Sequence, residues 1–99
     1  MRTNLNKNGS RVLLSELAMG ASAMVLQVDD SGPDDAIAQR LRDLGFVAGE
    51  PVRLVATGPL GADPVLVQIG YTRFALRRAE AARVRVDTAQ FEIAGTPVP

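Results

Sequence analysis

Four aspartates near the middle of the chain are the side chains best suited to hold an ion. Asp29, Asp30, Asp34 and Asp35 lie in one short stretch, and carboxylate oxygens are the ligands that hard divalent cations prefer. A weakly bound divalent cation is therefore one interpretation. The simpler one is that Asp34 and Asp35 stabilise the positive end of a helix, while Asp29 and Asp30 keep a loop solvated. We favour the simpler interpretation and expect no cofactor.

Histidine and cysteine are both absent from the sequence. Their absence excludes Ser-His-Asp triads, cysteine nucleophiles, disulfides and ordinary imidazole or thiolate metal sites. The stretch GPLGADP at residues 58–64 is followed by neither a Lys-Ser/Thr pair nor a helix. It is therefore predicted to be a loop and not a phosphate-binding site. The serines have no nearby base, and we expect no enzymatic activity.

A group of arginines near the C-terminus is the second chemical feature: Arg73, Arg77, Arg78, Arg83 and Arg85. Only Glu80 opposes them within that segment. A basic patch of this kind could contact RNA or DNA phosphates, although only Tyr71 and Phe74 offer stacking faces. The alternation in FALRR and RVRV favours a second interpretation, in which these arginines form the solvated side of strands. We prefer the solvated face.

Length and net charge limit the number of domains and the kinds of partner that the chain can have. The 99 residues carry eleven basic and eleven acidic side chains, so net charge gives no argument for a nucleic-acid or membrane partner. A hydrophobic fraction of 46% is enough for one core, and the chain is too short for two. Without a signal peptide or a long apolar run, we expect a soluble, cytoplasmic protein that does not insert into the membrane. Residues 1–11 are predicted to be a flexible arm, 12–88 the domain and 89–99 a loose tail.

One helix must position these groups, and it is expected over about residues 33–44. Ser31 is its predicted N-cap, with Pro33 in the opening turn. Ile37, Leu41 and Leu44 form one apolar stripe that should be buried. Gly45 is placed to end the helix in a left-handed conformation, which would let Phe46 fold back on Leu41.

The rest of the chain is typical of short strands. They are expected at residues 23–28, 51–57, 64–69, 72–76 and 84–87, with Met24, Leu26 and Val28 on one face of the first. Gly70 and Tyr71 should form a tight hairpin turn. Short helical turns are predicted at SELAMG, capped by Ser15 with Leu14 and Leu17 inward, and at RRAEAA. Five short strands in so small a chain are best buried as a small barrel with one inserted helix, because an open sheet would leave edges exposed.

The segments RLRDLGFVAGEPVRLV and PLGADPVLVQIGYTRFALRRAEAARVRV resemble the FeoA family of small bacterial proteins of ferrous-iron uptake. The similarity runs from about Leu14 to Val86. It rests on LRDLGF-x-x-G, the PLG…DP loop, and ALRRAEA followed by a V-x-V strand. The chain departs from the pattern at Ala48, where proline commonly precedes the glycine, and by one extra residue, Ala62.

The resemblance implies an SH3-like β-barrel with an inserted helix. It also implies a non-enzymatic cytoplasmic protein that regulates FeoB, the membrane ferrous-iron transporter, through protein–protein contact. The family defines no catalytic residues. Two alternatives stay open, namely a nucleic-acid-binding barrel that uses the face from Arg73 to Arg85, and a carboxylate-based metal-responsive module. A homo-oligomer is also left open.

The expected FeoB contact residues lie in two groups. The first combines the outward helix arginines, Arg40 and Arg42, with the turn after the helix, from Phe46 to Glu50. Phe46 is the strongest candidate anchor of this group, because aromatic and arginine side chains dominate contact energies; we nevertheless prefer the interpretation that it is used in a capping contact with Leu41. The second group is the arginine face around Arg77 and Arg78.

Overall fold

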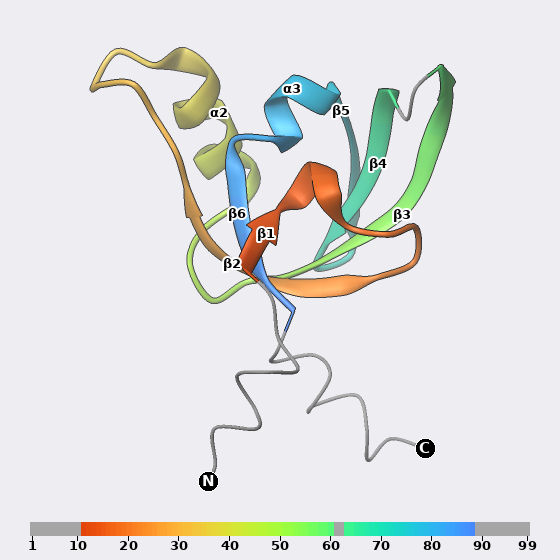
Figure 1. Cartoon of the computed structure of the whole chain (residues 1–99). Helices are drawn as coiled ribbons and strands as arrows, with labels where there is room; N and C mark the ends of the chain where they lie inside the picture. Colours follow the sequence, from red (N-terminus) through yellow and green to blue (C-terminus); the bar gives the residue numbers. More distant parts are fainter. Residues whose placement is uncertain (1–10, 61–62, 89–99) are drawn as a thin grey trace, which may run out of the picture.

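The computed structural model describes residues 11–60 and 63–88, and Figure 1 shows their arrangement. One antiparallel sheet contains six strands, in the order β1-β6-β2-β3-β4-β5. Their bounds are β1 Arg11–Leu13, β2 Ser22–Val28, β3 Pro51–Leu60, β4 Asp63–Ile69, β5 Thr72–Leu76 and β6 Val84–Asp87. Three short helical elements complete the fold: the 3-10 helix η1 Leu14–Glu16, α2 Ala36–Leu44 and α3 Arg78–Ala81.

The mainly β fold with an inserted helix is as predicted, and all five expected strands are present. The sheet has one strand more, because residues 11–13 pair with β6 through Val12 opposite Val86. Arg11 therefore belongs to the sheet and not to an arm. The other residues of the predicted arm, and the predicted tail 89–99, lie outside the described residues.

The prediction of a loop over residues 58–64 is wrong for most of that stretch. β3 continues to Leu60 and β4 begins at Asp63, so the two strands approach each other closely at this end. A Cβ atom at Gly58 would lie 2.6 Å from the carbonyl oxygen of Asp63. Glycine is needed here because the neighbouring strand leaves no room for a side chain.

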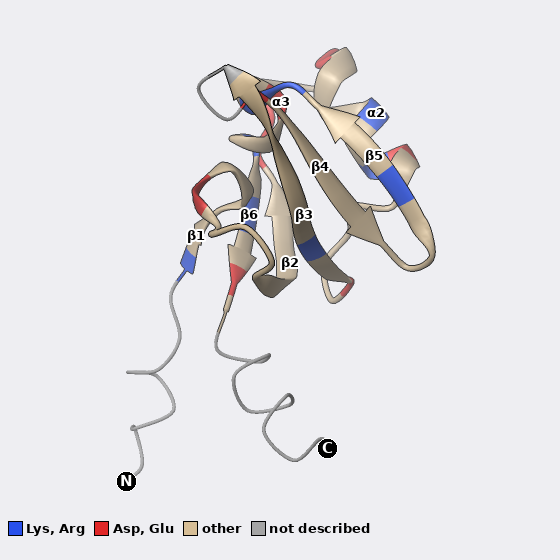
Figure 2. Cartoon of the chain, turned by 90° about the vertical axis from the view of Figure 1, so that its right-hand side faces the viewer, with Lys and Arg blue, Asp and Glu red and all other residues tan. Residues whose placement is uncertain are grey.

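The core lies inside the curve of the sheet and is built from aliphatic side chains with one aromatic ring. Phe46, Leu14, Leu41, Leu54 and Leu76 are among its largest fully buried members. In residues 11–60 and 63–88, no polar or charged residue is buried as a whole, although the Asp35 side chain is only 5% exposed. Leu14 and Leu17 are buried as predicted, which places η1 over the core. Figure 2, which faces β3 and β4, shows the strong twist of the sheet.

The first strand of the expected barrel has a different inward face from the one predicted. Ala23, Val25 and Val28 are buried, while Met24 and Leu26 are only half-buried. The register between β2 and β6 shifts between Val25 and Gln27. Such a bulge inserts one residue and reverses the alternation beyond it, so Val25 and Val28 both face inward.

The helix α2 begins later than predicted, and its cap is not Ser31. Asp35 is the N-cap: its side chain accepts a hydrogen bond from the Ala38 amide at 3.1 Å. A second carboxylate oxygen of Asp35 accepts from the Ser31 amide and hydroxyl. The residues predicted to open the helix, from Pro33 to Asp35, therefore precede it. Aspartate is the cap in place of serine because its carboxylate accepts hydrogen bonds both from a helix amide and from the turn before the helix.

The predicted apolar stripe is only partly correct. Leu41 and Ala38 are fully buried, but Ile37 is 41% exposed and Leu44 is half-buried. With the helix starting at Ala36, Ile37 lies in its first turn.

The end of α2 follows the prediction closely. Gly45 has a φ of 118°, in the left-handed region. Its amide donates to Arg42, and the Phe46 amide donates to the Leu41 carbonyl at 3.1 Å. This is the paired hydrogen bonding of a Schellman motif. It turns the chain sharply and directs Phe46 into the core.

The two other short helical segments contact each other. The RRAEAA prediction is confirmed by α3, and Glu80 accepts from the Arg77 amide at 3.0 Å. In η1 the equivalent acceptor is Glu16, which bonds the Leu13 amide at 2.8 Å, so Ser15 is not the cap. The hairpin at Gly70 and Tyr71 is confirmed, with Ile69 opposite Thr72 and a φ of 60° at Gly70.

Candidate partner-binding surface

Most of the four aspartates that could have held a cation form ion pairs with arginines. Arg85 bonds both carboxylate oxygens of Asp29, at 2.8 and 2.9 Å. Arg42 bonds Asp30 at 2.5 Å, and Arg83 bonds Asp35 at 2.6 Å. Among the described residues, no group of three or more acidic side chains is placed to hold a metal ion. A cation at Asp29, Asp30 or Asp35 would have to displace a bound guanidinium.

The pKa values of these carboxyls reflect the same pairing. The pKa of Asp35 is strongly lowered, first by the hydrogen bond from Arg83 and then by the amides of Ala38 and Ser31. The pKa of Asp29 is lowered mainly by the hydrogen bond from Arg85. Each carboxylate is therefore held in its charged form by donors that already occupy it.

The C-terminal arginine group does not form one basic face. Arg83 and Arg85 pair with aspartates that precede α2, far away in sequence. Arg73 donates to Gln68 at 3.0 Å, and the Arg78 amide donates to Asp63. Glu80 is the only acidic residue within the arginine segment itself. In the folded protein, however, Asp29 and Asp35 also pair with arginines of this segment.

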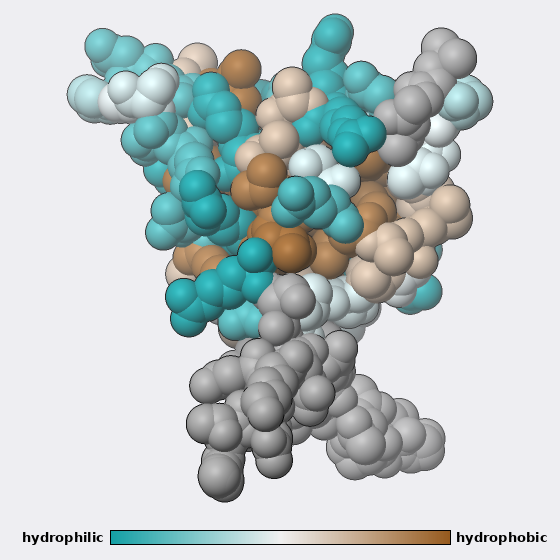
Figure 3. All heavy atoms as spheres, in the orientation of Figure 1, coloured by the Kyte–Doolittle hydropathy of each residue, from teal (hydrophilic) through white to brown (hydrophobic). Residues whose placement is uncertain are grey.

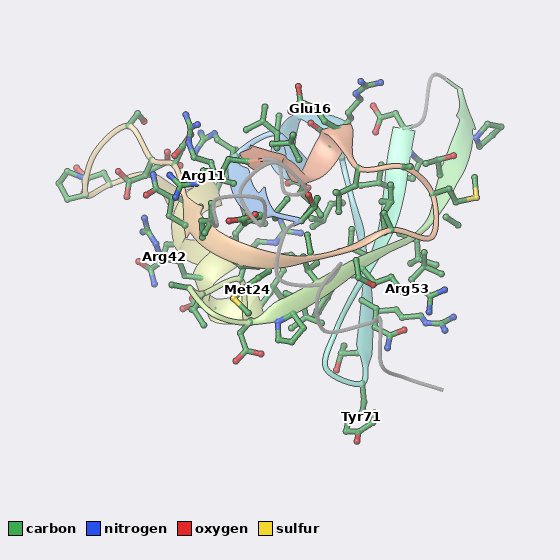
Figure 4. All side chains as sticks on the ribbon, turned by 60° about the horizontal axis from the view of Figure 1, so that its bottom comes forward. Arg11, Glu16, Met24, Arg42, Arg53 and Tyr71 are labelled. Atoms are coloured by element: carbon green, nitrogen blue, oxygen red, sulfur yellow. The ribbon has the colours of Figure 1, made fainter. Side chains whose placement is uncertain are left out.

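The two helix arginines of the first expected contact group, Arg40 and Arg42, bind different parts of the molecule. Arg40 reaches from α2 to Glu80 of α3 at 2.9 Å, while Arg42 faces the opposite way and bonds the Val28 carbonyl and Asp30. Glu80 also accepts from the Arg77 amide, which lowers its pKa. Arg40, Arg77 and Glu80 thus meet at one point, with Arg78 next in the chain. Arg42 lies on the other side of the molecule from Arg53 and Tyr71 (Figure 4).

Phe46 is fully buried and contacts Phe74, with ring centroids 6.3 Å apart. This burial contradicts the interpretation of Phe46 as an exposed anchor and agrees with the preferred one, in which the residue is used inside the fold. The capping turn directs the side chain inward, and the neighbouring Val47, 45% exposed, is the apolar residue that reaches the surface there. Glu50 is half-buried and lies at the edge of a different surface.

That surface is a groove that the sequence did not reveal. It has a volume of about 390 Å³ and lies between the start of β3 and the β4–β5 hairpin. We call it the Tyr71 groove, and its main lining residues are Ser22, Glu50, Pro51, Arg53, Gln68 and Tyr71. Arg53 and Gln68 alternate along their strands with the buried residues Val52, Leu54, Val67 and Ile69. Only the strand register, which places these two residues opposite each other, brings them together.

Figure 3 shows the face that carries β1 and η1, where apolar side chains reach the surface between polar ones, whereas polar side chains dominate over α2. In the described part of the chain, no helix has the length and apolar character needed to cross a membrane.

Comparison with known proteins identifies the family. The FeoA domain family matches residues 12–88. The chain belongs to the FeoA family. This FeoA domain is also 32% identical over 84 residues to a Porphyromonas gingivalis fusion of Fe(2+) transport protein A with the Fe(2+) transporter FeoB. That match covers 85% of the chain and 10% of the fusion protein, so the chain spans about a tenth of that relative's length.

Solved structures agree on the fold. Stenotrophomonas maltophilia FeoA in complex with zinc, described as a prokaryotic SH3 domain protein, is 60% identical with a TM-score of 0.72. The similarity covers 79% of this chain and 92% of that one. FeoA from Chlorobium tepidum is 36% identical with a TM-score of 0.66, covering 76% of this chain and 68% of the other. The predicted SH3-like fold of a FeoA domain is therefore confirmed, and the family links the chain to ferrous iron transport.

Proposed function

We propose that this protein is a non-enzymatic accessory protein of bacterial ferrous iron uptake, which acts in the cytoplasm by binding and regulating the FeoB transporter. The observation that carries the proposal is the Porphyromonas gingivalis relative, in which a FeoA segment and FeoB are joined in one chain. Fusion keeps two proteins together at a high effective concentration. That arrangement is useful when the separate proteins also associate.

The site chemistry is consistent with a binding role. Histidine and cysteine are absent from the whole sequence, and the described carboxylates near α2 are mostly held in ion pairs. Such groups stabilise a surface and are poorly placed to act as general acids or bases.

The two alternative functions receive less support. The arginines that would contact nucleic-acid phosphates include Arg83 and Arg85, which are bound to aspartates. The zinc complex of the Stenotrophomonas maltophilia relative is a reason to test divalent cations. In this chain, Asp29, Asp30 and Asp35 would need to release their arginines first.

The test is a pull-down of the tagged full chain with the cytoplasmic part of FeoB from the same organism, with the tag alone as the control. Retention of FeoB by the chain is expected. A complete lack of association, when both the chain and the FeoB fragment are folded, would contradict the proposal. Size measurement of the free chain in the same buffer shows whether it acts as a monomer or as a homo-oligomer.

A further inference from the structure

A row of polar side chains from four adjacent strands runs through the Tyr71 groove, where Ser22, Arg53 and Gln68 line it, and ends beside it at Arg73. Ser22 of β2 lies opposite Arg53 of β3, Arg53 lies opposite Gln68 of β4, and Gln68 lies opposite Arg73 of β5. Residues opposite each other in antiparallel strands project from the same face of a sheet. Their neighbours Val52, Leu54 and Val67 are buried, so this row projects outward. Figure 2 shows basic positions on β3 and on β5 on either side of β4.

The two arginines of this row differ from most others on the molecule. Arg40, Arg42, Arg83 and Arg85 each bind a carboxylate. In residues 11–60 and 63–88, by contrast, neither Arg53 nor Arg73 has a carboxylate partner within ion-pair distance. Arg73 is held by the Gln68 side chain, which also donates to the Gly70 carbonyl. The row therefore presents two uncompensated positive charges, one of them oriented by a neutral side chain.

Tyr71 adds an apolar anchor beside these charges. It is fully exposed at the turn of the β4–β5 hairpin, and Figure 4 shows it projecting away from the body of the protein, on the same side as Arg53. A tight two-residue hairpin holds its backbone, so little backbone entropy remains to be lost on binding. Tyrosine and arginine are the side chains most often found at the energetic centre of protein interfaces.

From these observations we infer that the Tyr71 groove binds an acidic segment of a protein partner. Carboxylates of the segment would pair with Arg53 and Arg73, and an apolar side chain would lie between Tyr71 and Pro51. Arginine suits this role because its planar group can bind a carboxylate through two hydrogen bonds. The identity of the partner rests on the proposed function, which makes it the cytoplasmic part of FeoB.

A protein segment fits the groove better than a nucleic acid. The exposed ring of Pro51 lines the same groove and gives it apolar surface beside Tyr71. A phosphate backbone would leave this apolar surface uncovered, whereas an apolar side chain of a protein segment can cover it. The chain also has no net charge to attract a polyanion.

The experiment uses the full chain and two single charge reversals of equal size. Arg53→Glu alters the groove, and Arg11→Glu alters an exposed arginine of β1 at the other edge of the sheet. Arg53 makes no described hydrogen bond or ion pair, so its replacement should not unfold the protein, and thermal unfolding checks this. Tyr71→Ser is the third variant. Binding to cytoplasmic FeoB is measured by calorimetry at low and high salt.

We expect Arg53→Glu and Tyr71→Ser each to weaken FeoB binding by about tenfold or more, because both remove an anchor of the groove. Arg11→Glu should bind like the unaltered chain, and salt should weaken the binding of the unaltered chain. Equal FeoB affinity in all of these proteins would overturn the inference while leaving the proposed function intact.

A peptide titration separates the two proposals if FeoB does not bind at all, an outcome that overturns the proposed function. The probe is a short peptide of glutamate, leucine and serine, followed by amide NMR shifts, with lysine replacing glutamate in the control peptide. Shifts at Arg53, Gln68 and Gly70 with the acidic peptide only would support the groove as an acidic-segment site. No shift there, or tighter binding of a single-stranded RNA oligonucleotide that Arg53→Glu abolishes, would refute it.

Discussion

At the scale of single residues, Gly45 is the position where the backbone conformation most strongly requires glycine. Its φ of 118° is strained for any residue with a Cβ atom, and a Cβ there would lie 3.4 Å from a methyl group of Ile69. Gly45→Val should lower the free energy of unfolding by about 1–3 kcal/mol. Urea denaturation measures this, with Ala48→Val at the exposed neighbouring turn as the control. If the two variants are equally stable, the capping role of Gly45 is wrong.

Asp35 is the residue that couples stability most directly to pH. Its folded pKa lies below the ordinary value of 3.8, first because of Arg83. The folded state therefore binds fewer protons than the unfolded state near that pH. The stabilisation is fully present above the unfolded pKa and is lost as the pH falls below about 4.

Asp35→Asn keeps a side-chain acceptor at the N-cap but removes the charge. We expect this variant to be less stable than the unaltered chain at neutral pH, and the difference to shrink as the pH is lowered towards 3, as measured by denaturation at several pH values. Asp34→Asn, at an exposed neighbour outside the helix cap, is the matched control. A difference that does not depend on pH would show that the charge of Asp35 contributes nothing.

At the scale of elements, α2 attaches to the sheet through a short part of its predicted stripe. Leu41 is fully buried and Ile37 is 41% exposed. Leu41→Ala should therefore cost about 2–5 kcal/mol of unfolding free energy, because it leaves a cavity. Ile37→Ala on the same helix should cost less than about 1 kcal/mol, since it is an exposed position. Equal midpoints for the two variants in chemical denaturation would mean that the helix is not packed as described.

At the scale of the whole molecule, the distribution of charge limits metal binding. The sequence offers no thiolate or imidazole ligand, and the aspartates near α2 mostly bind arginines. We predict that a single chain has no high-affinity site for ferrous iron or zinc, and that any cation is held by carboxylates and water, including sites shared between chains. Anaerobic calorimetry with each metal on monomeric protein tests this. A submicromolar site would contradict it.

Local features of this protein could be predicted from the sequence because they depend on neighbours along the chain. The glycine that ends α2, the hairpin at Gly70 and Tyr71, and the turn of helix after Arg77 all follow from short-range backbone chemistry. The absence of histidine and cysteine likewise needed no structure to exclude whole classes of catalytic and metal sites.

Only the tertiary structure decided which side chains meet. Arg83 and Asp35 pair across 48 positions, and strand register places Gln68 between Arg53 on one side and Arg73 on the other. A slip of one residue in register moves every side chain of a strand to the other face, and the bulge in β2 makes such a change. Alternation along a strand shows which positions share a face, but it cannot show which face is buried or what lies opposite. For that reason the Tyr71 groove emerges only when the sheet closes around its core.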